Sequence, residues 1–71
     1  MRFRVVHSFY NNLSLAKKNL SKVKTKWDSA YLINETDGQV IVLFETDNYK
    51  EAEKILHKVF SIGLWCGIQR I

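Results

Sequence analysis

The chain has 71 residues and a net charge of +4, from 11 lysines and arginines against 7 aspartates and glutamates. This length predicts one small domain with a limited core, and so modest a charge requires no acidic partner. The single cysteine excludes an intrachain disulfide, and the sequence contains no apolar run of about 18 residues that could span a membrane.

The first half of the chain predicts a strand, a helix and a second strand. Residues 2–10 alternate between the two faces of a strand, with Phe3 and Val5 toward the core. Asn12 is a natural helix N-cap. An apolar stripe at helical spacing follows it, made of Leu13, Ala16, Leu20, Val23 and Trp27. Residues 28–34 alternate again and predict the second strand.

The second half repeats this order. Residues 35–38 predict a hairpin connection in which Gly38 supplies a positive φ. Residues 40–44 are apolar at every position, which indicates a central strand covered on both faces. We expect Asn48 to cap the second helix, Glu51 to return the bond in a capping box, and Gly63 to end that helix. Residues 64–71 predict the last strand.

The two halves superpose at one offset, because Ala16 falls on Ala52 when the chain is shifted by 52 − 16 = 36 residues. The asparagine caps and the apolar stripes align at the same offset. We interpret residues 1–71 as a single domain with two strand–helix–strand repeats, over residues 2–34 and 38–70. The predicted fold is α+β with βαββαβ order, a ferredoxin-like sandwich of a four-stranded antiparallel sheet and two helices on one face. Handedness rules place the first and third strands in the centre.

The open face of this sheet, which points away from the helices, is the candidate binding surface. Alternation along the strands assigns these ligand-binding residues to it: Arg4, Val6, Ser8, Tyr31, Val42, Phe44, Trp65 and Gln69. Ile33 and Val40 are assigned to the same face. Such an apolar and aromatic surface usually marks a binding site. A homodimer that packs two of these faces together explains the pattern equally well, and a slip of one residue in register would invert every assignment.

No catalytic or metal-binding constellation is found. His7 and His57 lie on different predicted elements without neighbouring ligands. Glu35 and Asp37 suit a turn, and Cys66 among apolar residues is typical of a small hydrophobe. The lysines of the first helix are interpreted as a solvated face. We therefore expect no enzyme activity, no metal and no cofactor.

The segment Phe3-Arg4-Val5-Val6-His7-Ser8-Phe9-Tyr10, with Ala16 six residues after Tyr10, resembles the first repeat of the SPOR family. These sporulation-related repeat domains share the βαββαβ order and bind peptidoglycan. In the second half Ile41 and Leu43 take the family's valine positions and Ala52 its alanine. The family's glutamine falls on Val6, and its glycines fall on Ser8 and Phe44.

This resemblance covers nearly the whole chain. It implies that the open face binds glycan strands stripped of their peptides. The C–H faces of sugar rings can pack on aromatic side chains, here Tyr31, Phe44 or Trp65. Arg4, Ser8 and Gln69 can hydrogen-bond the sugar hydroxyl groups.

A second likeness is to the RNA-recognition motif, which has the same order of elements. Residues 38–44 followed by Glu51-Ala52 resemble its third strand and second helix. The positions at which that motif stacks bases on aromatic rings fall here on Gln39 and Ile41. Basic residues lie mainly on the predicted helices, so nucleic acid is the less favoured ligand.

The leading hypothesis is thus a non-catalytic, SPOR-like module that recognises peptidoglycan glycan strands. The alternative is a stand-alone cytosolic module that uses the same face for a protein partner, which it can inhibit, or for a second copy of itself; nucleic-acid binding is third. The N-terminal MRFRVVHSF lacks the apolar stretch of an export signal. We expect a cytoplasmic protein if the chain is complete, and a cell-wall or periplasmic one if it is a fragment of an exported protein.

Overall fold

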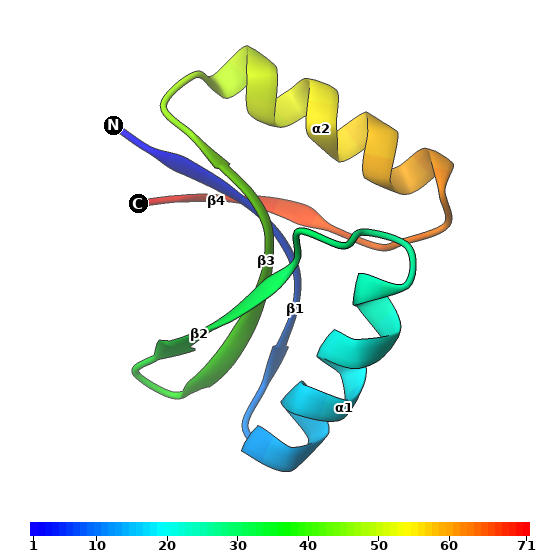
Figure 1. The fold of residues 1–71 in the computed structure, drawn as a ribbon. Helices are drawn as coiled ribbons and strands as arrows, with labels where there is room; N and C mark the ends of the chain where they lie inside the picture. The colour runs from blue at the N-terminus through cyan, green and yellow to red at the C-terminus, as the bar shows by residue number, and fades with distance from the viewer.

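The computed structural model describes residues 1–71 as one four-stranded antiparallel sheet with two helices. Its elements are β1 (Phe3–Tyr10), α1 (Leu13–Lys24), β2 (Tyr31–Glu35), β3 (Gly38–Thr46), α2 (Tyr49–Ser61) and β4 (Gly67–Arg70). The strand order is β2-β3-β1-β4, so the first and third strands are central, as predicted. Both helices cover one face of the sheet (Figure 1). The predicted α+β fold with a ferredoxin-like βαββαβ arrangement is therefore confirmed.

Both edge strands are shorter than the sequence predicts. β2 begins at Tyr31, because residues 28–29 form a turn that follows α1. β4 begins at Gly67, because the three residues before it belong to the connection from α2. The alternation rule therefore does not apply to these residues, which matters for Trp65 below.

Gly63 ends α2, as predicted, through a Schellman motif. Its φ of 85° is a left-handed value that favours glycine. The Gly63 N–H donates to the Phe60 carbonyl at 3.0 Å, and the Leu64 N–H donates to the Val59 carbonyl at 3.2 Å. These two bonds satisfy carbonyl groups that the end of the helix leaves free.

Asparagine side chains cap both helices at their N-termini. Asn12 accepts a hydrogen bond from the third residue of α1, and Asn48 accepts two from the first turn of α2. The predicted capping box is wrong, because the Glu51 carboxylate accepts from the Thr46 hydroxyl at 2.6 Å instead. That hydroxyl oxygen in turn accepts from the Asn48 N–H at 3.2 Å. Neither helix is long and apolar enough to cross a membrane.

The core lies between the helices and the sheet. Its buried cluster consists of Val5, Val23, Ala30, Ile41, Leu43, Ala52, Val59 and Cys66. Trp27 packs against this cluster, as predicted, and its Nε1 donates to the Leu43 carbonyl at 2.7 Å. Burial raises the pKa of the Cys66 thiol. The cysteine is thus a core residue, in line with its apolar sequence neighbours.

Two irregularities in the pairing of β1 with β3 shape the sheet. The register shifts between Val5 and Val6, and again between Val6 and Phe9. Extra residues of this kind bend a strand and increase its twist. Figure 1 shows the result as a strongly curved sheet with the helices on its convex side. The face that the sequence analysis calls open is therefore concave, and we call it the concave face.

The two ends of the chain lie side by side. Arg2 and Ile71 exchange two backbone hydrogen bonds, of 2.9 and 3.4 Å, which continue the pairing of β1 with β4. Figure 1 shows both termini at the same corner of the sheet.

Candidate functional site: the concave face of the sheet

A network of charged side chains centred on Glu45 of β3 lies at one end of the concave face. Arg2 Nε donates to Glu45 Oε1 at 2.9 Å, and Arg4 Nε donates to Oε2 at 3.3 Å. The Tyr31 hydroxyl donates to the same carboxylate at 3.2 Å. The hydrogen bond from Arg2, joined by those from Arg4 and Tyr31, lowers the pKa of Glu45. Burial, together with the Glu45 charge, raises the pKa of Tyr31.

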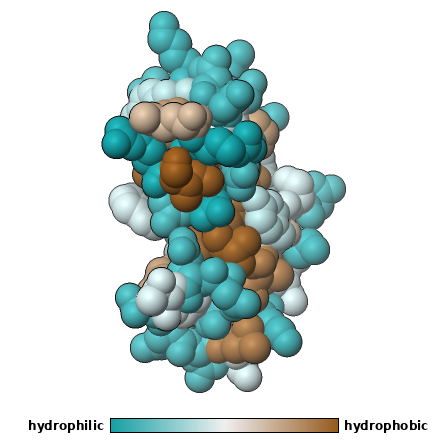
Figure 2. Space-filling view, turned by 90° about the vertical axis from the view of Figure 1, so that its left-hand side faces the viewer, coloured by the Kyte–Doolittle hydropathy of each residue, from teal (hydrophilic) through white to brown (hydrophobic).

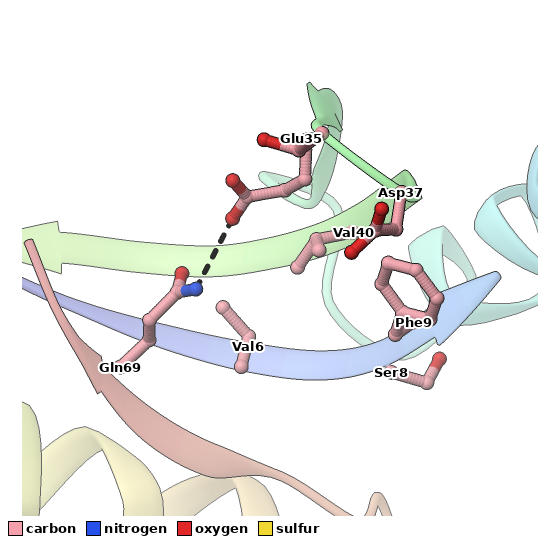
Figure 3. A pocket seen from close by; sticks show the side chains of 8 residues that line it. Val6, Ser8, Phe9, Glu35, Asp37, Val40 and Gln69 are labelled. Atoms are coloured by element: carbon pink, nitrogen blue, oxygen red, sulfur yellow. Dashed lines mark hydrogen bonds between the residues drawn. The ribbon is translucent and has the colours of Figure 1, made fainter. Parts of the chain in front are cut away.

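A second set of contacts crosses the concave face from edge to edge. Glu35, the last residue of β2, lies 3.8 Å from Arg4 Nη1. The same carboxylate oxygen accepts a hydrogen bond of 3.1 Å from Gln69 Nε2 of β4 (Figure 3). Side chains from three strands therefore meet above the centre of the sheet.

Next to these contacts the concave face is hollowed. The cavity, which we call the sheet hollow, has a volume of about 380 Å3. Its lining residues are Val6, Ser8, Phe9, Glu35, Thr36, Asp37, Val40 and Gln69. Val6, Val40 and Phe9 supply an apolar floor, and Figure 3 shows acid and amide groups around it. This volume lies within the range of small-ligand sites, roughly 300–1,000 Å3, although the lining is more polar than is usual for them.

Several polar groups of the sheet hollow have no partner within the protein. Ser8 Oγ and Gln69 Oε1 are buried without a hydrogen bond. Asp37 forms no salt bridge. Most buried polar atoms in folded proteins are hydrogen-bonded, so the two buried atoms depart from the usual pattern. Asp37, in contrast, is exposed and can bind a ligand or water.

Six of the eight predicted site residues lie on the concave face. Arg4 pairs with Gln69 across β1 and β4, and Tyr31 pairs with Val42 across β2 and β3. Val6, Ser8 and Gln69 line the sheet hollow. Val42 is fully buried, so it supports this face without offering a contact. The predicted set is thus largely brought together, but Phe44 and Trp65 are not part of it.

Phe44 lies on the helical side of the sheet, and its predicted position on the open face is wrong. It pairs with Val5 and packs against the core cluster. The cause is the register shift beside it, through which Leu43 and Phe44 both contribute to the core although they are consecutive. Phe9, which pairs with Val40, supplies the aromatic ring of the concave face instead.

Trp65 is also misplaced by the prediction, because it precedes β4 and does not follow the alternation of a strand. Its side chain is 74% exposed. The indole packs against Phe60 of α2, with ring centroids 5.8 Å apart. His7 Nδ1 donates to the Trp65 carbonyl at 2.6 Å and holds this connection against β1. Trp65 therefore packs against the end of α2 and lies outside the sheet. The contact of His7 with its carbonyl gives the histidine a structural role.

The expected large apolar surface is reduced to small areas. Val40 and Val42 are only 5% and 0% exposed, although no helix covers them. The curvature of the sheet and the side chains that cross it enclose these valines. Figure 2, which views this side of the molecule, shows separate apolar areas among hydrophilic side chains. The concave face is therefore mixed in character, with an apolar floor and a polar rim.

Four lining residues of the sheet hollow are not among the predicted site residues: Phe9, Glu35, Thr36 and Asp37. Glu35 and Asp37 were assigned to the turn alone. Gly38 begins β3, so the loop residues are Thr36 and Asp37, neither of which has a positive φ. The pair Phe9-Tyr10 carries a usable signal, because two consecutive aromatic residues cannot both face the core of a regular strand.

A second hollow lies at the ends of both helices. Lys24, Lys26 and Lys58 line it together with Trp27, over which Lys58 Nζ lies 5.9 Å from the ring centroid. None of these lysines forms a salt bridge. Their place near helix C-termini accounts for the positive charge, because the helix dipole stabilises it there.

The fold and its concave hollow define a small α+β domain with a candidate binding site. No group of three or more histidine, cysteine, aspartate or glutamate residues is arranged to hold a metal ion. Comparison with protein-family models finds no matching family, and searches of curated proteins and of solved structures find no match either.

Proposed function

We propose that this chain is a non-catalytic binding module that holds a glycan strand on the concave face. The observation that carries the proposal is the sheet hollow, in which hydrogen-bonding side chains surround an apolar floor. Sugars present both C–H faces and hydroxyl groups, and therefore need both kinds of contact. The likeness of residues 3–10 to the SPOR repeat supports peptidoglycan as the source of the glycan.

Phe9 is the residue on which a sugar ring would pack. Its side chain is 53% exposed, and it lies beside the buried Val40 at the floor of the hollow. The exposed Thr36 hydroxyl and Asp37 carboxylate would hydrogen-bond sugar hydroxyl groups, and Gln69 also lines the hollow. This division of roles differs from the one the sequence predicts, since the ring comes from β1 and not from Phe44 or Trp65.

The charges on the concave face argue against nucleic acid as the ligand. Three carboxylates lie there, from Glu35, Asp37 and Glu45, and only Arg2 and Arg4 oppose them. A phosphate backbone binds to clustered positive charge. A second copy of the chain on this face is also less favoured, because two concave surfaces meet only at their rims.

Binding to purified glycan strands that lack peptides tests the proposal. We expect Phe9→Ala and Gln69→Ala each to weaken binding by roughly tenfold, the scale of one lost packing or hydrogen-bonding contact. Trp65→Ala is the matched control, because it removes an exposed aromatic ring that lies outside the hollow. Absence of binding, or an equal loss in Trp65→Ala, would refute the proposal. Sedimentation of the free chain as a dimer that the glycan cannot dissociate would favour self-association instead.

A further inference from the structure

The sheet hollow has a negative lining. Glu35 and Asp37 contribute two carboxylates, and no lysine or arginine is among the lining residues. Arg4 approaches Glu35 from outside the lining, at 3.8 Å, whereas Asp37 has no salt-bridge partner. The chain as a whole carries a charge of +4, so this local field has the opposite sign to that of the molecule.

Gln69 fixes the position of one of these carboxylates. Its Nε2 is occupied as the donor to Glu35, at 3.1 Å, and this bond fixes which end of the amide is free. The free end is Oε1, which is buried and accepts no hydrogen bond. Because this oxygen is enclosed, the acceptors that a ligand can reach are the two carboxylates. The hydroxyls of Ser8 and Thr36 are the only side-chain donors of the lining besides the Gln69 amide.

A ligand that suits this lining donates hydrogen bonds and carries positive charge. We propose, as an extension of the glycan-binding function, that the sheet hollow selects sugars with a free, protonated amino group over their N-acetylated counterparts. An ammonium group offers three donors and a positive charge to the two carboxylates. An acetamide group is neutral, offers one donor, and adds a carbonyl acceptor that the carboxylates repel. The floor of Phe9, Val6 and Val40 packs against the ring of either sugar.

Titration of the chain with two β-1,4-linked glucosamine tetramers tests the inference, one fully N-acetylated and one fully de-N-acetylated. We expect the de-N-acetylated tetramer to bind roughly fivefold more tightly, the scale of one partly exposed ion pair. The preference must disappear when the pH is raised above the pKa of the sugar amine. The net positive charge of the protein repels cations. Tighter binding of the charged tetramer would therefore show that the carboxylates of the hollow attract it locally.

Asp37→Asn is the decisive variant, because it removes one lining charge and keeps the size and turn preference of the residue. We expect it to bring the two affinities close together, chiefly by weakening the binding of the de-N-acetylated tetramer. Asp47→Asn is the control, since Asp47 is an exposed acid outside the hollow, and it must leave the preference intact.

The remaining outcomes separate this inference from the proposed function. Equal or tighter binding of the N-acetylated tetramer, or a preference that survives Asp37→Asn, overturns the inference and leaves glycan binding standing. Failure of both tetramers, together with failure of purified glycan strands, overturns both. A trilysine peptide that binds as tightly as the amino sugar would show that the hollow takes basic peptides and would overturn the sugar assignment.

Discussion

Gln69 Nε2 donates a hydrogen bond of 3.1 Å to Glu35 Oε1, although the two residues lie on opposite edge strands of the sheet. Neighbouring strands are about 4.8 Å apart, so three strand spacings separate the edges of a flat sheet by roughly 14 Å. The curvature that follows from the shifted pairing of β1 with β3 brings the two side chains together. The bond between Gln69 and Glu35, and with it this part of the candidate site, therefore depends on the curvature of the concave face.

The first prediction concerns this cross-sheet bond. Gln69→Ala and Glu35→Ala should show a coupling free energy of about 0.5–1.5 kcal/mol in a double-mutant cycle, the usual net value of a hydrogen bond. Urea unfolding of the four proteins measures it. Glu35 also pairs with Arg4, but that contribution cancels in the cycle. Additive single effects would mean that the bond contributes nothing to stability.

The second prediction compares Phe44, whose predicted face is wrong, with Phe9, which supplies the aromatic ring of the concave face. Phe44→Ala should lower the free energy of unfolding by about 3 kcal/mol, because it leaves a cavity beside the core cluster. Phe9→Ala should cost less than about 1 kcal/mol, since the residue is 53% exposed. Urea unfolding with circular dichroism compares them. Equal costs would place Phe44 outside the core.

The third prediction concerns acid stability. Because its partners lower the pKa of Glu45 in the folded chain, its contribution to stability is present above about pH 4.3, the ordinary glutamate pKa, and is lost as the pH falls through the lowered value. Glu45→Gln should be less stable than the native chain at pH 7, and this difference should shrink on acidification. Thermal unfolding between neutral and acidic pH measures it. Glu53→Gln, at an exposed position without a salt bridge, serves as the control.

The fourth prediction concerns the two glycines at the ends of strands. A Cβ atom at Gly38 would lie 2.2 Å from the Tyr10 carbonyl oxygen and 2.9 Å from Phe9 Cζ. Gly38→Ala should therefore lower the free energy of unfolding by about 1–3 kcal/mol, the usual cost of overpacking. Gly67→Ala is the matched control, since a Cβ there meets no atom within 4 Å. Urea unfolding should show a large cost for the first variant only.

The fifth prediction uses the single thiol as a probe of the core. Cys66 is 3% exposed, and burial raises its pKa, so both access and thiolate formation are suppressed in the folded chain. Labelling by a thiol reagent at pH 8 should be slow in buffer and rapid in urea. The labelling rate should follow the fraction of unfolded chain, because opening of the core is required first. Rapid labelling in buffer would contradict the burial.

The sequence was sufficient for the order of elements, because local chemistry encodes it. Asn12 and Asn48 mark the N-termini of the two helices, and Gly63 marks the end of the second one. The apolar stripes identify the side that each helix buries. These signals depend on residues close together in the chain. The strand order followed from handedness rules that apply to any pair of such units.

The site could be predicted only in part, because the faces of β3 depend on its pairing with β1. Every residue from Val40 to Phe44 is apolar, so no alternation reveals the shifted register that turns Phe44 toward the helices. The start of β4 at Gly67 likewise depends on how α2 ends. Because β4 starts only there, Trp65 lies outside the sheet. The meeting of Glu35 and Gln69 depends on curvature that no local pattern contains.

The pairing of Arg2 with Ile71 has a consequence for how the gene could be rearranged. Since both ends meet on adjacent strands, a short glycine-rich linker could join them, and new ends could be opened in the exposed segment between β3 and α2. Such a circular permutant would begin with α2 and finish with β3 while keeping every interstrand contact. For the same reason the domain can be inserted into a surface loop of a host protein, which needs only two closely spaced attachment points.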